Sequence, residues 1–197
     1  MTDHFAEALI TFRDLLDEAR SAGDPEPTAM SLATVDGDGQ PTCRTVLLKD
    51  FDERGFVFYT NTESRKGQQL HDRPKAALLF HWKTLRHQVQ VKIEGHAEPV
   101  TREEADAYFA SRPRVSQLGA WASQQSRELD RRETLDQRLA EFEREFDGRE
   151  VTRPPYWSGY RIVPQRIEFW YGVPYRLHDR HEYRKVNGEW RHGLLYP

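Results

Sequence analysis

The stretch Gly55-Phe-Val-Phe-Tyr-Thr-Asn-Thr-Glu-Ser-Arg-Lys-Gly67 decides the fold, because it predicts a strand that leads directly into a helix. Alternate side chains of a strand share a face, so the pattern indicates a half-buried strand that ends at Asn61. The two faces would carry Phe56, Phe58 and Thr60 on one side and Val57, Tyr59 and Asn61 on the other. Thr62 or Ser64 would then cap the first free N–H groups of the helix.

Arg65 and Lys66 would occupy the first turn of that helix, where cations oppose the helix macrodipole. A phosphate would remove this conflict, because it accepts hydrogen bonds from the helix N–H groups and from both side chains. A solvated basic turn is the alternative, and an Arg-Lys pair alone would favour it. Arg44 and Lys49 lie one hairpin away, and their presence favours an anion site.

Composition limits the possible partners. The 197 residues include 29 Lys and Arg against 32 Asp and Glu, so a formal net charge of −3 recruits neither nucleic acid nor an acidic membrane. The longest apolar run, residues 76–80, is too short to cross a bilayer, and the N-terminus lacks the apolar segment of a signal peptide. We therefore expect a cytoplasmic protein.

The length favours one domain over residues 1–197, with an N-terminal helix and linker over 1–26 and the core over 27–197. Cys43 is the single cysteine, so no internal disulfide can form. We expect Cys43 to be a small strand residue rather than a nucleophile.

Hydrophobic periodicity and turn signals predict an α+β domain built on a small closed barrel. Helices are expected over residues 1–22, 101–111 and 129–146, and a short helix is expected directly after the cap at residue 62 or 64. Residues 114–125 carry no clear pattern. Helix 1–22 would pack across a barrel end, and helix 129–146 would be mostly solvated. Strands are expected over 28–35, 42–49, 56–61, 74–82, 87–100, 157–163 and 166–171, with a hairpin over 182–190. The strands of the first half would form an antiparallel meander.

Four blocks of sequence carry a specific resemblance. They are Arg44-Thr-Val-Leu-Leu-Lys49 and residues 58–67, 108–126 and 167–180. In this order and spacing, from about Pro27 to Trp190, the chain closely resembles the pyridoxamine 5′-phosphate oxidase family. The resemblance implies an FMN-binding antiparallel split β-barrel with peripheral helices, working as a homodimer with active sites between the subunits. It also implies that pyridoxine or pyridoxamine 5′-phosphate is oxidised to pyridoxal 5′-phosphate, with O2 as acceptor and H2O2 released.

The resemblance assigns FMN contacts to one set of residues. They are Arg44, Thr45, Val46, Leu47, Leu48, Lys49, Tyr59, Thr60, Arg65, Lys66, Gln125, Ser126, Trp170 and Arg180. These residue types suit the ligand, because cations and hydroxyls hold a phosphate of about −1.5 to −2 charges and an indole offers a flat wall. An amide at Gln88 would meet the flavin ring edge. Gln90 is the alternative, because this strand is longer than the family's by a dipeptide.

The resemblance also assigns a substrate site. Lys49, Tyr108, Arg112 and Ser116 match positions that hold the substrate phosphate, and Arg176 and His178 match the pair against the pyridine ring. The implied reaction transfers a hydride from the substrate C4′ carbon to the flavin N5. Arg176 would orient the reacting carbon, with His178 as a hydrogen-bonding or proton-transfer group.

The basic clusters also have plainer interpretations. Residues 112–114 would form a helix-ending basic turn, and residues 178–180 a surface salt-bridge cluster. A metal site at His178, Asp179 and His181 is weaker still, because the spacing fits no common zinc pattern. We expect no metal.

Two departures from the family pattern affect the substrate site more than the flavin site. The family usually has an N-terminal extension with an Arg and a Tyr that help to close the site, and this chain is expected to lack it. The end Leu194-Leu-Tyr-Pro197 replaces a common Arg-Leu-Xaa-Pro and loses a cation at Leu194. The leading rival is a related flavin oxidase for a phenazine-type dihydro-aromatic compound. The other alternative is a non-catalytic protein that binds FMN or pyridoxal phosphate, although such a protein would not need a second phosphate site.

Overall fold

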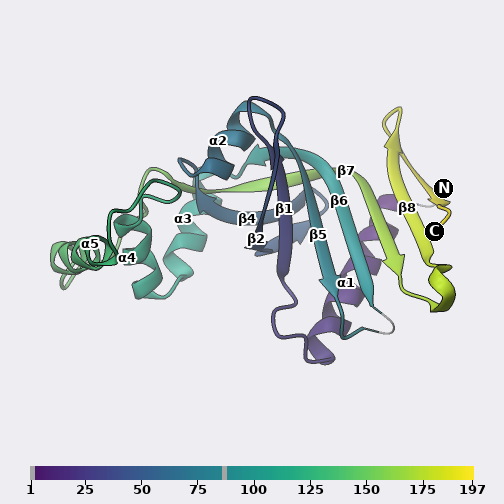
Figure 1. The fold of residues 1–197 in the computed structure, drawn as a ribbon, viewed down its shortest axis with the longest axis horizontal. Coiled ribbons are helices and arrows are strands. Elements are labelled where there is room, and N and C mark those ends of the chain that lie inside the picture. The colour runs from purple at the N-terminus through teal and green to yellow at the C-terminus, as the bar shows by residue number, and fades with distance from the viewer. Residues whose placement is uncertain (1–2, 86–87) are drawn as a thin grey trace.

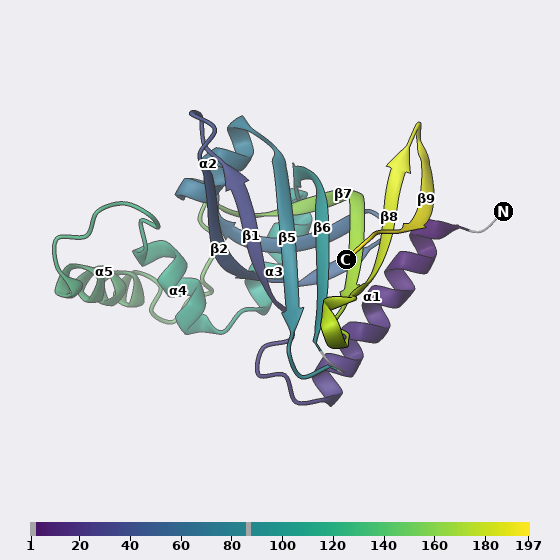
Figure 2. The same cartoon turned by 45° about the vertical axis from the view of Figure 1, so that its right-hand side comes forward.

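A curled antiparallel sheet of nine strands forms the centre of the computed structural model, which describes residues 3–85 and 88–197 (Figure 1). Met1, Thr2, Arg86 and His87 lie outside the described residues, and with them the predicted starts of helix 1–22 and strand 87–100. Helices α3, α4 and α5 extend from one end of the sheet, whereas β8 and β9 lie at the other (Figure 1, Figure 2).

The observed elements confirm most of the predicted ones. The helices are α1 (His4–Ser21), α2 (Arg65–Asp72), α3 (Arg102–Ser111), α4 (Arg114–Ala122), α5 (Arg132–Glu145) and the 3-10 turn η1 (Pro174–Arg176). The strands are β1 (Ala29–Val35), β2 (Pro41–Leu47), β3 (Asp50–Asp52), β4 (Gly55–Asn61), β5 (Lys75–Trp82), β6 (Val89–Pro99), β7 (Trp157–Tyr171), β8 (Asp179–Val186) and β9 (Glu189–Leu194). The segment without a clear pattern thus contains α4.

The predicted meander is wrong. The strand order is β2-β1-β5-β6-β7-β4-β3, so β1 pairs with β5 and β4 pairs with β7. Each predicted hairpin forms, but α2 follows β4 and carries the chain away before β5 begins. Between β2 and β3, the Lys49 N–H donates to the Val57 carbonyl of β4 at 2.8 Å.

The two strands predicted over 157–163 and 166–171 are one bent strand, β7. Its first half pairs with β4 and its second half with β8, while β6 pairs with both halves. The register shifts between Glu94 and Gly95 of β6, which marks a bulge that bends the pair. A side chain at Gly95 would clash with the carbonyl of Val163, so the bend needs glycine at this position.

Helix α1, predicted to pack across a barrel end, contributes its buried face to the barrel core (Figure 2). Its buried face recurs at helical spacing and consists of Ala8, Leu9, Phe12, Leu15, Leu16 and Ala19. The Phe12 ring lies 4.8 Å from Phe51, 5.0 Å from Phe56 and 5.1 Å from Phe80, each edge to face. These aromatic contacts fix the N-terminal helix to the sheet.

The prediction that the strand at 55–61 is half-buried is wrong, because β4 is buried on both faces. Val57 on the outer face is 2% exposed and packs with Val100 and Ala105, which α3 and the segment before it supply. By contrast, α5 contains no buried residue, which confirms the predicted solvated helix. The cover from α3 therefore makes β4 a fully buried strand beneath the site.

Candidate functional site

The turn from β4 into α2 places two cations side by side, as the sequence predicts. Ser64 is the N-cap, and its Oγ accepts a hydrogen bond from the Gly67 N–H at 3.3 Å. A side chain at Gly67 would clash with the carbonyl of Thr62, so the tight entry into α2 needs glycine. Arg65 and Lys66 follow in the first turn, where no acidic residue lies.

Lys66 is a half-buried cation surrounded by neutral oxygens. Its Nζ donates to Thr60 Oγ1 at 3.1 Å and to Ser64 Oγ and Gln125 Oε1 at 3.3 Å. Burial lowers the pKa of Lys66, and the positive charge of Arg44 lowers it further. Among the described residues no carboxylate lies within ion-pair distance of Nζ, so an added anion would stabilise this ammonium.

Arg44 and Arg65 lie close to Lys66 but do not line a pocket with it. Arg44 points into a polar cluster, where its Nη1 donates to Thr34 Oγ1 and its Nη2 lies 3.3 Å from Gln69 Oε1. Burial lowers the pKa of Arg44, and the charge of Arg65 adds to this effect. Arg65 is exposed and lies 3.5 Å from Asp36. The predicted cations thus lie within electrostatic range of one another without a common carboxylate.

A central pocket of about 570 Å³ collects most of the predicted residues from β2, β4, α2, α3 and α4. Its predicted lining residues are Thr45, Val46, Leu47, Lys49, Tyr59, Thr60, Lys66, Tyr108, Arg112, Ser116 and Gln125. The Leu48 side chain is in the barrel core, so only the backbone of this residue is available to a ligand there. Residues predicted to hold two different phosphates therefore share one cavity.

Arg112 is held in this pocket by an aromatic stack. Its guanidinium carbon lies 4.7 Å from the centre of the Trp157 ring, and its Nη1 is buried without a hydrogen-bond partner. Tyr59 and Tyr108 stack at 4.1 Å, and Tyr59 and Trp157 at 5.5 Å. Burial lowers the pKa of Arg112, which again favours an anionic ligand.

Trp157 is a candidate functional residue that sequence reasoning missed. It begins β7, far from Arg112 in the chain, and reads as an ordinary strand aromatic. Only the fold brings its ring under the guanidinium, so the sequence offered no local signal. Ser111 and Pro113 also line the pocket and flank Arg112.

A distal pocket of about 290 Å³ lies at the end of β6 and β7 and shares no residue with the central pocket. Its lining includes Gln88, Trp170 and His178, and the Trp170 and His178 rings lie 4.4 Å apart. Gln90 is the register partner of Trp170 on β6, and Arg180 is its partner on β8. Gln88 and Gln90 are therefore both close to Trp170, and the choice between them stays open.

Backbone strain gathers at the predicted residues. Among the described non-glycine residues, positive φ angles occur at Gln88 (99°), Ser126 (75°), Tyr175 (58°), Arg176 (61°) and Asn187 (52°). Asn187 belongs to the Asn-Gly hairpin turn, where this geometry is expected. The other four are predicted site residues or, for Tyr175, next to one. A positive φ at a non-glycine residue costs conformational free energy and is typical of functional sites. Ser126 and Arg176 line neither the central nor the distal pocket.

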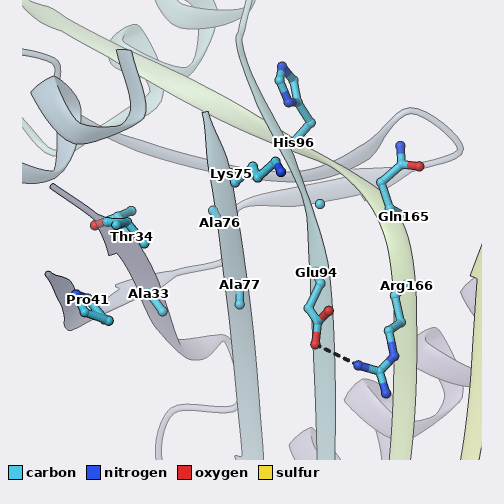
Figure 3. A pocket seen from close by; sticks show the side chains of 12 residues that line it. Ala33, Thr34, Pro41, Lys75, Ala76, Ala77, Glu94, His96, Gln165 and Arg166 are labelled. Atoms are coloured by element: carbon cyan, nitrogen blue, oxygen red, sulfur yellow. Dashed lines mark hydrogen bonds and ion pairs between the residues drawn. The ribbon is translucent and has the colours of Figure 1, made fainter. Parts of the chain in front are cut away.

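A third pocket, of about 510 Å³, crosses β1, β5, β6 and β7 and contains none of the predicted residues (Figure 3). Small residues such as Ala33 and Ala77 form its floor, and an ion pair between Glu94 and Arg166 at 3.1 Å lies on its wall. Within residues 3–85 and 88–197, no cluster of His, Cys, Asp or Glu is suited to a metal ion. Over the same ranges, no helix combines the length and apolar character needed to cross a bilayer.

Comparisons with known proteins give a consistent result. Residues 16–144 match the family described as "Pyridoxamine 5'-phosphate oxidase". Residues 157–197 match the "Pyridoxine 5'-phosphate oxidase C-terminal dimerisation region". A pyridoxine/pyridoxamine 5′-phosphate oxidase from Xanthomonas euvesicatoria pv. vesicatoria (strain 85-10) is 54% identical over 199 residues, covering 100% of both chains. One from Myxococcus xanthus (strain DK1622) is 56% identical over 186 residues, covering 94% of this chain and 89% of that relative.

Two solved structures share the fold. PhzG from Burkholderia lata 383, in complex with tetrahydrophenazine-1-carboxylic acid, has a TM-score of 0.91 and 31% identity, covering 100% of this chain and 98% of that chain. A pyridoxamine 5′-phosphate oxidase-related, FMN binding protein from Nostoc punctiforme PCC 73102 has a TM-score of 0.72 and 17% identity, with 94% and 97% covered. The second likeness shows the fold alone. Together with the curled sheet, these structures confirm the predicted split-barrel class.

Proposed function

Because the chain belongs to the pyridoxamine 5′-phosphate oxidase family, we propose that it oxidises pyridoxamine 5′-phosphate, pyridoxine 5′-phosphate or both to pyridoxal 5′-phosphate. The chain is an oxidoreductase of this family, and FMN is the cofactor that membership implies. In the proposed reaction, O2 is the acceptor and H2O2 is released. With pyridoxamine 5′-phosphate, water supplies the aldehyde oxygen and the amino group leaves as ammonia. The observation that carries the proposal is the central pocket, in which Lys66 and Arg112 are half-buried cations without acidic partners among the described residues.

The residues of the central pocket fit an FMN phosphate. Within the described residues, the Lys66 ammonium contacts only neutral oxygens. The positive charge of Arg44 lies close enough to lower the pKa of Lys66. A phosphate of about −1.5 to −2 charges would offset both cations. Gln125 would then share its amide between Lys66 and the ligand. These side chains therefore fit the phosphate end of FMN.

Arg112, Lys49, Tyr108 and Ser116 offer the substrate phosphate two cations and two hydroxyls in the same pocket. The unpartnered Nη1 of Arg112 supports this assignment, because a buried N–H donor without an acceptor costs free energy that a phosphate oxygen would recover. A helix-ending basic turn, the plainer interpretation, would leave the Arg112 side chain in solvent.

Residues proposed to act on one substrate are divided between the two pockets. Arg112 lies in the central pocket, whereas His178 lines the distal pocket and Arg176 is in η1 beside it. A homodimer that joins the central pocket of one subunit to the distal pocket of the other would bring them together. The match of residues 157–197 to a dimerisation region supports this arrangement, because this segment carries Trp170, Arg176 and His178.

When bound, FMN supplies a two-electron acceptor that O2 can reoxidise. The chain supplies position and hydrogen bonds. The Val173 N–H donates to His178 Nδ1 at 3.4 Å, so a neutral His178 ring carries its proton on Nε2 and is a hydrogen-bond donor there. Consecutive left-handed residues at Tyr175 and Arg176 hold the Arg176 backbone in one geometry, which suits an orienting role.

A rival substrate follows from the likeness to PhzG, whose structure contains tetrahydrophenazine-1-carboxylic acid. The curated relatives at 53–56% identity carry the vitamin B6 name and favour the main proposal over this 31% likeness. A non-catalytic FMN or pyridoxal phosphate carrier is the third possibility. The cytoplasmic location, the single-domain division and the absence of nucleic-acid or membrane partners stay predictions.

The test is to purify the protein, record its flavin absorbance, and add pyridoxamine 5′-phosphate or pyridoxine 5′-phosphate in air. We expect the purified protein to contain bound flavin. Turnover should then give H2O2 and pyridoxal 5′-phosphate in equal amounts. Flavin with turnover of a dihydrophenazine acid alone would select the rival oxidase, and flavin without turnover of either would select the carrier. A protein that binds no FMN would contradict both oxidases and the FMN carrier.

A further inference from the structure

Two parallel rows of side chains cross β6, β7 and β8 on one face of the sheet. Gln90, Trp170 and Arg180 are register partners in the first row. Lys92, Glu168 and Glu182 form the second row, two residues along each strand. Side chains two apart on a strand share a face, so the charged row lies beside the predicted flavin-contacting row.

Glu168 is the buried centre of the charged row. It is 3% exposed, and its Oε1 accepts a hydrogen bond from Arg180 Nε at 2.8 Å while its Oε2 lies 2.9 Å from Lys92 Nζ. Arg166 Nη2 lies 3.7 Å from the same Oε2. Burial raises the pKa of Glu168, but the hydrogen bonds from Arg180 and Lys92 outweigh this and hold it below its ordinary range. The carboxylate is therefore ionised and shared among cations.

Arg180 is fixed from two sides. Its Nε donates to Glu168, and its Nη1 donates to the Tyr196 carbonyl at 2.7 Å. A guanidinium is planar, so two such contacts determine the plane of the whole group. Within the described residues Nη2 has no hydrogen-bond partner, which leaves its two N–H groups for a ligand.

We propose that Glu168 is a positioning residue for FMN, holding the Arg180 guanidinium in the orientation in which it meets the cofactor. The proposal rests on the proposed function, because Arg180 contacts FMN only if the chain binds it. Without the carboxylate, the Arg180 side chain would have to be ordered by the cofactor itself, and this lost preorganisation would weaken binding.

Glu182 provides a matched control on the same sheet face. It is 8% exposed and is the register partner of Glu168, but it pairs with Arg166 at 2.6 Å and Arg184 at 3.4 Å rather than with Arg180. Arg166 also forms an ion pair with Glu94, and Figure 3 draws this ion pair. Removing the charge of Glu182 therefore disturbs the same network without touching Arg180.

The experiment measures the Kd of FMN for apoprotein by quenching of flavin fluorescence, in wild type, Glu168→Gln, Glu182→Gln, Arg180→Ala and the double variant Glu168→Gln/Arg180→Ala. We expect Glu168→Gln to raise Kd about tenfold, as for loss of one charged hydrogen bond. Glu182→Gln should change Kd less than about twofold. The double variant should bind no worse than Arg180→Ala, because Glu168 acts through Arg180. Thermal unfolding of each apoprotein shows whether it is folded.

Three results would overturn the proposal: an unchanged Kd in Glu168→Gln while Arg180→Ala binds weakly, an equal loss in Glu182→Gln, or additive losses in the double variant. If Glu168→Gln does not fold, Glu168→Asp keeps the charge but is one methylene too short for Arg180 Nε. It should raise Kd several-fold, whereas an unchanged Kd would overturn the proposal. Wild-type apoprotein that binds no FMN would instead contradict the proposed function.

Discussion

At the scale of single residues, Lys66 combines a lowered pKa with contacts to the neutral oxygens of Thr60, Ser64 and Gln125. We predict that Lys66→Met raises the Kd of FMN at least about tenfold, because it removes the charge-assisted hydrogen bond that the half-buried ammonium would donate to the phosphate. Fluorescence titration of apoprotein measures this. Lys75→Met, at an exposed lysine outside the central pocket, is the control and should bind as wild type. Equal binding by both variants would contradict the phosphate role.

Substitution of Trp157 should affect the substrate more than FMN, because its ring lies 4.7 Å from the Arg112 guanidinium carbon and reaches the proposed FMN contacts through the Tyr59 ring. Trp157→Leu should raise the KM for pyridoxamine 5′-phosphate about three- to tenfold, through loss of a cation–π contact of about 1 kcal/mol and of the stack that orders Arg112. The Kd of FMN should change less than about twofold. Steady-state kinetics at saturating FMN separates the two effects. Trp190→Leu, which removes an aromatic packed on Phe5 of α1, is the control and should leave KM unchanged.

At the scale of elements, α3 is tied to the sheet by an ion-pair cluster around the buried Arg161. Arg161 of β7 donates to Glu104 at 2.7 Å and to Asp52 at 3.0 Å, and Arg54 lies 3.0 Å from Glu104. The Thr101 N–H that closes the capping box lowers the pKa of Glu104, and Arg161 and Arg54 lower it further. This cluster fixes the helix that carries Tyr108 to the central pocket.

We predict that Glu104→Gln destabilises the protein by about 1–2 kcal/mol at neutral pH, because it keeps a capping-box acceptor but removes the charge opposite Arg161. The folded pKa of Glu104 lies below its ordinary 4.5. Its charge therefore contributes stability above pH 4.5, and this contribution is lost as the pH falls through the folded value. Urea unfolding at several pH values should show the difference from wild type shrinking below pH 4.5. Glu103→Gln, in the same helical turn, should show no such loss.

The sequence predicted the helices, strands and turns better than it predicted which of them pack together. Turn residues and caps act within a few positions, so the Asn-Gly hairpin and the Ser64 cap were predictable. The burial of β4 on both faces depends on α3, and the pairing of β4 with β7 depends on a contact across 100 positions. Trp157 was missed for the same reason. The residues of the central pocket were predictable only because the family resemblance carries this long-range information.

At the scale of the whole molecule, the central and distal pockets share no residue, and the elements that carry them diverge. Helices α3 and α4 extend from one end of the barrel, while β8 follows η1 at the other (Figure 1, Figure 2). Catalysis needs the substrate phosphate and the reacting carbon held at once, within one small ligand. We therefore expect the proposed site to be complete only where two chains meet.

This arrangement predicts complementation between two inactive variants. Arg112→Ala disables the central pocket and Arg176→Ala the orienting group, so each homodimer should lose most of its activity. Co-expressed with two different affinity tags and purified through both, the hybrid dimer has one site with both changes and one with neither, because a two-fold dimer exchanges residues symmetrically. We expect about half of the wild-type activity. If each site were built within one chain, every site in the hybrid would carry one change, and its activity would stay at the level of the parents. A hybrid of Arg112→Ala with a second tagged Arg112→Ala chain controls for purification and should stay inactive.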